Sequence, residues 1–144
     1  MSGTSSCWRG STTSVSARAR RIGTASSARP PIIAGYERLI AEAHARHIRI
    51  FGATLLPFRG AGYYTAQGEA TREAVNAWIR GSGAFDGVID FDRVMRDPAD
   101  PLRLNPEYDS GDHLHPGDAG YLAMANAVNL EMLLPRRSPS PAPR

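Results

Sequence analysis

Between residues 32 and 134 the chain alternates helical and strand-like patterns, and this alternation most constrains its fold. Apolar side chains recur at helical spacing in IIAGYERLIAEAHARH (32–47), in GEATREAVNAWIRGSG (68–83) and again after Asp118. Short runs rich in β-branched and aromatic residues, IRIFGATLL (48–56) and FDGVIDFD (85–92), follow the first two helices. A helix that twice feeds a short strand predicts a parallel sheet covered by helices, which is an α/β fold.

Proline, glycine and aspartate set the expected limits of these elements. Pro57 ends the first strand, and Gly81 ends the second helix. The segment DPADPLRLNPEYDSGDH (97–113) holds three prolines and is expected to be a loop. Asp118 is expected to cap a last helix. One face of that helix should carry Tyr121, Met124, Ala125, Val128 and Met132.

The two ends of the chain differ in composition from its middle. Residues 1–31 are rich in Arg, Ser, Ala, Thr and Gly, residues 135–144 are rich in Pro and Arg, and we expect both segments to be disordered. Eight of the 17 basic residues lie in these ends, so residues 32–134 carry nine arginines against 14 acidic residues. Because no basic stripe interleaved with aromatic residues is present, no nucleic-acid partner is expected.

Few features of the sequence point to a compartment. The single cysteine, Cys7, cannot form an internal disulfide. No run approaches the ~18 apolar residues of a membrane-spanning helix, so no membrane span is expected. Residues 1–31 lack the apolar stretch of a secretory signal, and the localisation of the protein stays open.

The segment SGDHLHPGDAGY (110–121) concentrates two of the four histidines before the last helix. Asp112 and His115 are three residues apart in a loop held by Pro116. A carboxylate in that position can bind one imidazole nitrogen and leave the other free to take a proton from a hydroxyl nucleophile. Two alternatives are a metal site built from Asp112, His113 and His115, for which no further ligand is identifiable nearby, and a polar loop that caps the helix.

This segment resembles the C-terminal block of the SGNH (GDSL-type) hydrolases. The match is to the pattern D-x-L-H-P-x-x-x-G-Y, and it extends back through GVIDFD, NAWIR, GATLLPF and the first helix, so it covers residues 32–134. The resemblance implies a three-layer α/β/α, flavodoxin-like fold and the hydrolysis of small-molecule acyl or acetyl esters without metal or cofactor. It also implies that His115 is the general base and Asp112 its orienting partner.

The family's other catalytic blocks are not found, so the nucleophile is unknown. No serine before Glu37 follows Gly-Asp, and no Gly-x-Asn-Asp block is present. With two strands only, the family domain is expected to lack its N-terminal half, and the break at Pro30 and Pro31 suggests a truncated or frame-shifted gene product. We therefore expect the isolated chain to be inactive. The alternatives are a non-catalytic remnant or interaction module that binds through an unpaired sheet edge, and, less favoured, a metal-dependent hydrolase.

Several nearby side chains have simpler interpretations than a catalytic one. His113 is expected to be an exposed loop residue, and Asp90 and Asp92 are expected to cap the end of the second strand or to steady the loop of Asp112. Tyr63 and Tyr64 are either candidates for an acyl pocket or locally packed loop aromatics.

Overall fold

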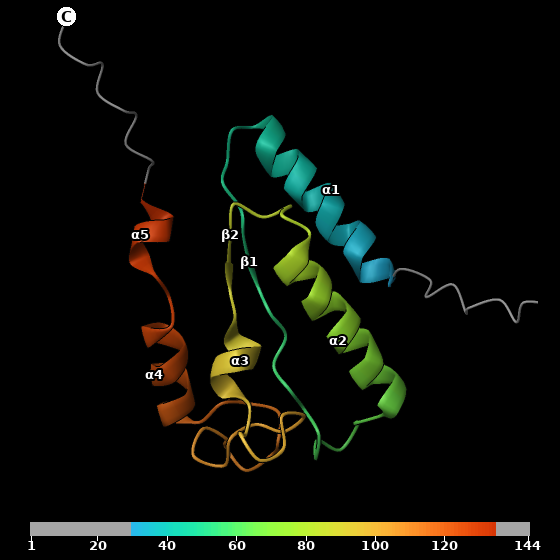
Figure 1. The fold of residues 1–144 in the computed structure, drawn as a ribbon, viewed down its shortest axis with the longest axis vertical. Coiled ribbons are helices and arrows are strands. Elements are labelled where there is room, and N and C mark those ends of the chain that lie inside the picture. The colour runs from blue at the N-terminus through green and yellow to red at the C-terminus, as the bar shows by residue number, and fades with distance from the viewer. Residues whose placement is uncertain (1–29, 135–144) are drawn as a thin grey trace, which may run out of the picture.

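The computed structural model describes residues 30–134, and residues 1–29 and 135–144 lie outside this description (Figure 1). The expectation that both ends are disordered concerns residues outside this description, except for Pro30 and Pro31. Cys7 also lies outside it. The elements in chain order are α1 (Pro31–Ala45), β1 (Phe51–Ala53), α2 (Ala66–Gly81), β2 (Gly87–Ile89), α3 (Phe91–Met95), α4 (Asp118–Asn126) and α5 (Leu130–Leu133). No described helix is long and apolar enough to cross a membrane.

The two strands form a parallel sheet, which confirms the expected α/β alternation. Phe51 pairs with Gly87 and Ala53 pairs with Ile89, and the Thr54 N–H extends the ladder by donating to the Ile89 carbonyl at 3.1 Å. Within residues 30–134 the sheet has these two strands only. Figure 1 shows α1 and α2 on one side of the strands and α4 and α5 on the other.

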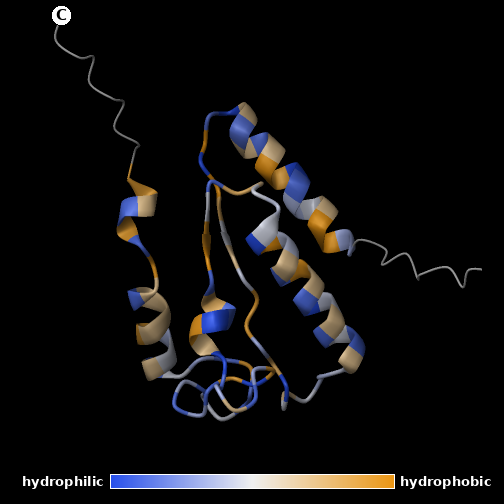
Figure 2. Cartoon of the chain, in the orientation of Figure 1, coloured by the Kyte–Doolittle hydropathy of each residue, from blue (hydrophilic) through white to orange (hydrophobic). Residues whose placement is uncertain are grey.

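The core lies where α1 and α2 pack against the strands. Ile33, Val75 and Ile79 are almost fully buried there, and an aromatic cluster surrounds them. Trp78 stacks on Tyr36 at a centroid distance of 6.2 Å, as expected for a core tryptophan. The remaining partly buried members of this core are Phe85 and Val88. In Figure 2 the helices show mixed polarity, whereas many hydrophilic residues gather in the loops below the strands.

Gly52 in the middle of β1 is required by this aromatic packing. A Cβ atom at Gly52 would lie 2.6 Å from a ring carbon of Phe85, which is far inside van der Waals contact. The absence of a side chain in the strand therefore admits the aromatic ring against the sheet.

Helix α3 was not predicted, and the reason lies at Asp90. The sequence suggested a strand to Asp92, but the strand ends at Ile89, and the Asp90 carboxylate accepts the Arg93 N–H at 3.2 Å. Asp90 is thus the N-cap of a five-residue helix. The expected role was to cap the end of a strand, but Asp90 caps the start of a helix, and Asp92 lies inside that helix.

The single last helix and its cap were predicted wrongly. Gly117 occupies the N-cap position, and Asp118 is the first helical residue, with no side-chain cap bond. The helix ends at Asn126. The Asn129 side chain then accepts the Glu131 N–H at 3.0 Å and caps α5 as a separate helix. Of the expected apolar face, Met124 and Ala125 lie in α4, Met132 lies in α5 and Val128 lies between the two helices. Tyr121, also in α4, is exposed.

Candidate active site

The loop between Tyr108 and Gly117 carries the predicted site residues and is closed by its own backbone. The Ser110 N–H donates to the His115 carbonyl at 3.0 Å, and the Gly117 N–H donates to the Tyr108 carbonyl at 2.7 Å. We call residues 108–117 the dyad loop. Helix α4 starts directly after it, so the loop is fixed at its base to a regular element.

Asp112 and His115 lie together in this loop. Asp112 Oδ2 is 2.6 Å from His115 Nδ1, and Asp112 Oδ1 accepts the N–H groups of Leu114 at 2.9 Å and His115 at 2.8 Å. The carboxylate thus holds both the ring and the backbone of the histidine. Among the described residues, none is hydrogen-bonded to His115 Nε2, so this nitrogen is available to an incoming group.

The Asp112 carboxylate is kept ionised by these contacts. The hydrogen bond from His115, followed by those from the backbone, holds the pKa of Asp112 well below its usual range. Asp112 is half-exposed and His115 more so. At neutral pH Asp112 is therefore a carboxylate facing the His115 ring, which is the arrangement that fixes a histidine tautomer.

A second Asp–His pair, missed in the sequence, lies in the same loop. Asp109 Oδ2 is 2.6 Å from His113 Nδ1. His113 is an exposed loop residue, as expected, but the binding of its ring to a carboxylate was not predicted. Burial opposes the ionisation of Asp109, but hydrogen bonds from Gly111 and His113 outweigh it and lower the pKa of Asp109. The available signal was the four-residue spacing between Asp109 and His113.

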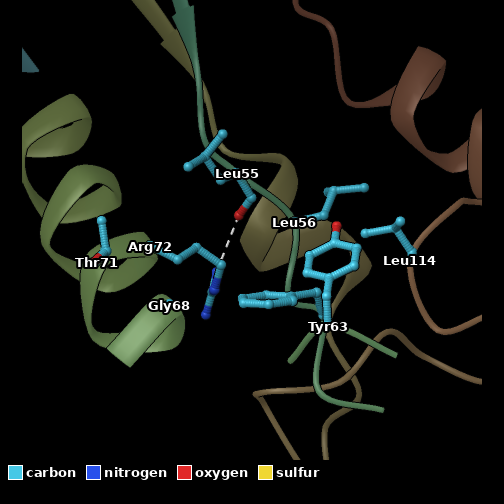
Figure 3. A pocket seen from close by; sticks show the side chains of 8 residues that line it. Leu55, Leu56, Tyr63, Gly68, Thr71, Arg72 and Leu114 are labelled. Atoms are coloured by element: carbon cyan, nitrogen blue, oxygen red, sulfur yellow. Dashed lines mark hydrogen bonds between the residues drawn. The ribbon is translucent and has the colours of Figure 1, made fainter. Parts of the chain in front are cut away.

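An apolar pocket of about 350 Å³ opens beside the dyad loop (Figure 3). It lies between the segment after β1, the first turns of α2 and Leu114, which stands between Asp112 and His115 in the sequence. The lining residues are Leu55, Leu56, Phe58, Tyr63, Gly68, Thr71, Arg72 and Leu114. A cavity of this size and lining has the character of a small-molecule site.

The two tyrosines of the preceding loop have different places. Tyr63 lines the pocket, where Figure 3 shows its ring near Leu114 and Leu56. Tyr64 is not among the lining residues and packs on Phe58 at a centroid distance of 5.2 Å, and Tyr63 contacts the same ring at 5.7 Å.

One wall of the pocket is fixed by a buried ion network. Arg72, 7% exposed, pairs with Glu69 and Asp92 at 2.6 Å each and donates to the Leu55 carbonyl at 3.1 Å. Asp92 also pairs with Arg80, so α2 and α3 are tied together. Neither Asp90 nor Asp92 contacts the dyad loop through a polar bond, and the suggestion that they steady it is therefore wrong.

The comparison with protein families places this site in context. The model of the GDSL-like Lipase/Acylhydrolase family matches residues 3–123 of the chain. The chain belongs to this family. Membership of the GDSL-like acylhydrolases suggests an esterase or lipase and implies an α/β/α fold. The matched range includes the pocket and the dyad loop, and it begins inside the segment 1–31. No curated protein matches the chain.

The described part of this acylhydrolase chain offers two serines, and neither is placed as a nucleophile. Ser110 Oγ donates to Asp112 Oδ1 at 3.1 Å, whereas His115 binds the other carboxylate oxygen, Oδ2. Ser82 accepts the Ala84 N–H at the end of α2. Neither hydroxyl is hydrogen-bonded to His115.

The metal site considered from Asp112, His113 and His115 is not assembled. Each imidazole binds a different carboxylate through Nδ1, His113 to Asp109 and His115 to Asp112. Among residues 30–134, no three His, Cys, Asp or Glu side chains are grouped so that they could hold a metal ion.

Proposed function

We propose that Asp112 and His115 form the base of a serine ester-hydrolase site, in which His115 Nε2 takes the proton of a serine hydroxyl. The observation that carries this proposal is the 2.6 Å contact between Asp112 Oδ2 and His115 Nδ1, in a chain of the acylhydrolase family. A carboxylate at Nδ1 keeps the proton on that nitrogen and leaves Nε2 with its lone pair toward the hydroxyl. As the proton moves to Nε2, Asp112 stabilises the imidazolium that forms.

The pocket supports an ester with an apolar acyl group as the substrate. Its described lining is mainly Leu, Phe and Tyr side chains, and Leu114 connects it to the dyad loop. An acetyl group would occupy only a small part of about 350 Å³, whereas a longer acyl chain would bury apolar surface against these residues. The proposed reaction needs no cofactor.

The serine must come from outside residues 30–134, since Ser82 and Ser110 are both engaged elsewhere. We further propose that the two-stranded sheet is part of a larger, flavodoxin-like α/β/α sandwich. Without a nucleophile and oxyanion-hole donors, an Asp–His pair retains little of the catalytic effect of a complete site. Residues 30–134 on their own are therefore expected to hydrolyse esters very slowly.

A fluorophosphonate probe tests the role of His115 directly, because it labels a serine whose hydroxyl is activated by a base. The full chain is treated with the probe beside His115→Ala and His44→Ala variants, and any labelled residue is located by mass spectrometry. His44 is a matched control because it is also half-exposed and bound to a carboxylate, that of Asp86 at 3.0 Å.

Labelling of a serine that falls by about tenfold or more in His115→Ala and persists in His44→Ala is the result that a catalytic base predicts. A label that survives His115→Ala contradicts the proposal. A folded chain that takes no label is the result expected if its nucleophile is supplied by another chain.

A binding role without catalysis is the second candidate. The observation in its favour is the sheet itself, since within residues 30–134 each strand is paired on one side only. An extended segment of a partner could add to such an edge. This role requires no activated serine, so a His115-dependent label would contradict it.

A further inference from the structure

The Asp109–His113 pair has no part in the proton transfer proposed above, yet it is built more tightly than the catalytic pair. The Asp109 side chain is 8% exposed, against 49% for Asp112. Its Oδ2 binds His113 Nδ1 at 2.6 Å, and its Oδ1 accepts the N–H groups of Gly111 at 2.9 Å and His113 at 3.0 Å. One nearly buried carboxylate thus satisfies three donors of the dyad loop.

These donors lie on both sides of Asp112. Gly111 precedes Asp112 and His113 follows it, so Asp109 fixes the backbone that presents the Asp112 carboxylate. Asp112 in turn fixes the N–H groups of Leu114 and His115. Asp109 therefore fixes the backbone around Asp112, and Asp112 fixes the backbone up to His115. The position of His115 depends on both carboxylates.

His113 has a backbone conformation that requires support. Its φ is 61°, in the left-handed region that costs a non-glycine residue free energy. The bonds from Asp109 to its N–H and to its ring hold it there. Because Nδ1 is engaged with Asp109, the ring is fixed in one direction.

The His113 ring lies against the turn that follows β1. A Cβ atom at Gly60 would lie 2.9 Å from His113 Cγ, and Gly60 has a φ of 109°. The turn is itself anchored, since the Arg59 N–H donates to the Leu102 carbonyl at 2.9 Å and its side chain pairs with Asp100 at 3.1 Å. The ring of His113 therefore packs directly on the backbone of the anchored turn, because Gly60 has no side chain between them.

We infer that the Asp109–His113 pair is a positioning latch that holds the dyad loop on the Gly60 turn and so keeps Asp112 and His115 in hydrogen-bonding register. The importance of the latch for catalysis rests on the proposed function of His115. The effect of the latch on the Asp112–His115 hydrogen bond is independent of that function, and it can be measured whether or not the chain hydrolyses an ester.

The variants His113→Ala and His113→Asn separate a latch from a general packing role. Alanine removes the donor to Asp109 and disfavours a positive φ. Asparagine tolerates a positive φ and offers an amide N–H close to the position of Nδ1, so it should restore the latch. His44→Ala is the matched control, because it removes another half-exposed imidazole bound to a carboxylate, far from the dyad loop in the sequence.

The readout is the proton on His115 Nδ1, observed by NMR in the full, ¹⁵N-labelled chain at low temperature. Opening of the Asp112–His115 hydrogen bond exposes this proton to water, so its exchange rate reports the open population. We expect exchange to become about fivefold faster in His113→Ala, as the loss of one supporting hydrogen bond implies, and to remain near the wild-type rate in His113→Asn and His44→Ala. An unchanged rate in His113→Ala, or no rescue by asparagine, overturns the inference.

Gly60→Ala approaches the same contact from the other side. It keeps both members of the latch but places a methyl group 2.9 Å from His113 Cγ. If His113→Ala fails to fold, judged by the near-ultraviolet signal of the aromatic core, the test is decided by Gly60→Ala. Faster exchange of the His115 proton in this variant supports the latch, and wild-type exchange contradicts it.

Discussion

Replacement of Asn76 by alanine is predicted to destabilise the chain more than its single amide group would suggest. Asn76 lies in α2 and is 1% exposed. Its Oδ1 accepts the Leu55 N–H at 2.7 Å, and its Nδ2 donates to the Leu55 carbonyl at 2.8 Å. The side chain thereby continues the hydrogen-bonding pattern of β1 beyond Thr54 and ties the strand to the helix.

The two bonds differ in what their loss costs. The Leu55 carbonyl keeps a second donor, Arg72 Nη1 at 3.1 Å, so losing the Asn76 bond to it costs about 1 kcal/mol. The Leu55 N–H has no other acceptor among the described residues, and leaving this part-buried donor unsatisfied costs up to about 1–3 kcal/mol. The sum for Asn76→Ala is about 2–4 kcal/mol, a large part of the ~5–15 kcal/mol that stabilises a typical domain.

Urea denaturation followed by tryptophan fluorescence measures this loss, since Trp78 lies in the core beside α2. The control is Glu73→Ala, an exposed position on the same helix, for which we expect a change within about 0.5 kcal/mol. The midpoint should fall in Asn76→Ala while the slope is unchanged. A loss below about 0.5 kcal/mol would refute the reasoning, because it would mean that water satisfies the Leu55 N–H in the variant.

Two further predictions concern ionisation and packing. The pKa of Asp112 lies below its usual value, so the stabilisation from its hydrogen bonds is present above the unfolded-state pKa and is lost as the pH falls through the lower folded-state pKa. His115→Ala removes the largest cause of this shift, so the titration midpoint of the Asp112 carboxyl, followed by ¹³C NMR, should move upward. An unmoved midpoint would contradict this prediction. Gly52→Ala is expected to destabilise the chain by about 1–3 kcal/mol through its clash with Phe85. Gly35→Ala in α1, where a Cβ meets nothing within 4 Å, is expected to stabilise it by up to about 1 kcal/mol; equal denaturation midpoints for the two variants would refute the packing account.

The long helices could be predicted from the sequence because their packing is periodic. Ile40 in α1 and Val75 and Ile79 in α2 lie on the predicted apolar faces and are buried. Ile32 and Leu39, also expected on the face of α1, are exposed, and Ile33 is buried instead. The spacing of Asp112 and His115 likewise predicted a pair that the structure brings to 2.6 Å, while their role in a reaction stays a proposal.

The sequence-based predictions were wrong where a single polar side chain determines where a helix begins. Asp90 converts the end of a strand into a helix start, and Asn129 divides the last helix, yet each reads in the sequence as an ordinary polar residue. The Asp109–His113 pair was missed because it depends on a positive φ at His113 and on a contact with Gly60. Neither the backbone angle nor that long-range contact has a periodic signal.

The most direct test of the proposed acyl site is an NMR titration of the full chain with octanoate, a product that hydrolysis of an octanoyl ester would release. The account predicts saturable shifts at Leu114, Tyr63 and His115, because the alkyl chain enters the pocket while the carboxylate faces the dyad. Butanoate has four fewer CH₂ groups, each worth about 0.8 kcal/mol when buried, so octanoate should bind up to about 200-fold more tightly. Equal affinities for the two acids, or shifts that leave Leu114 and His115 unmoved, would contradict the account.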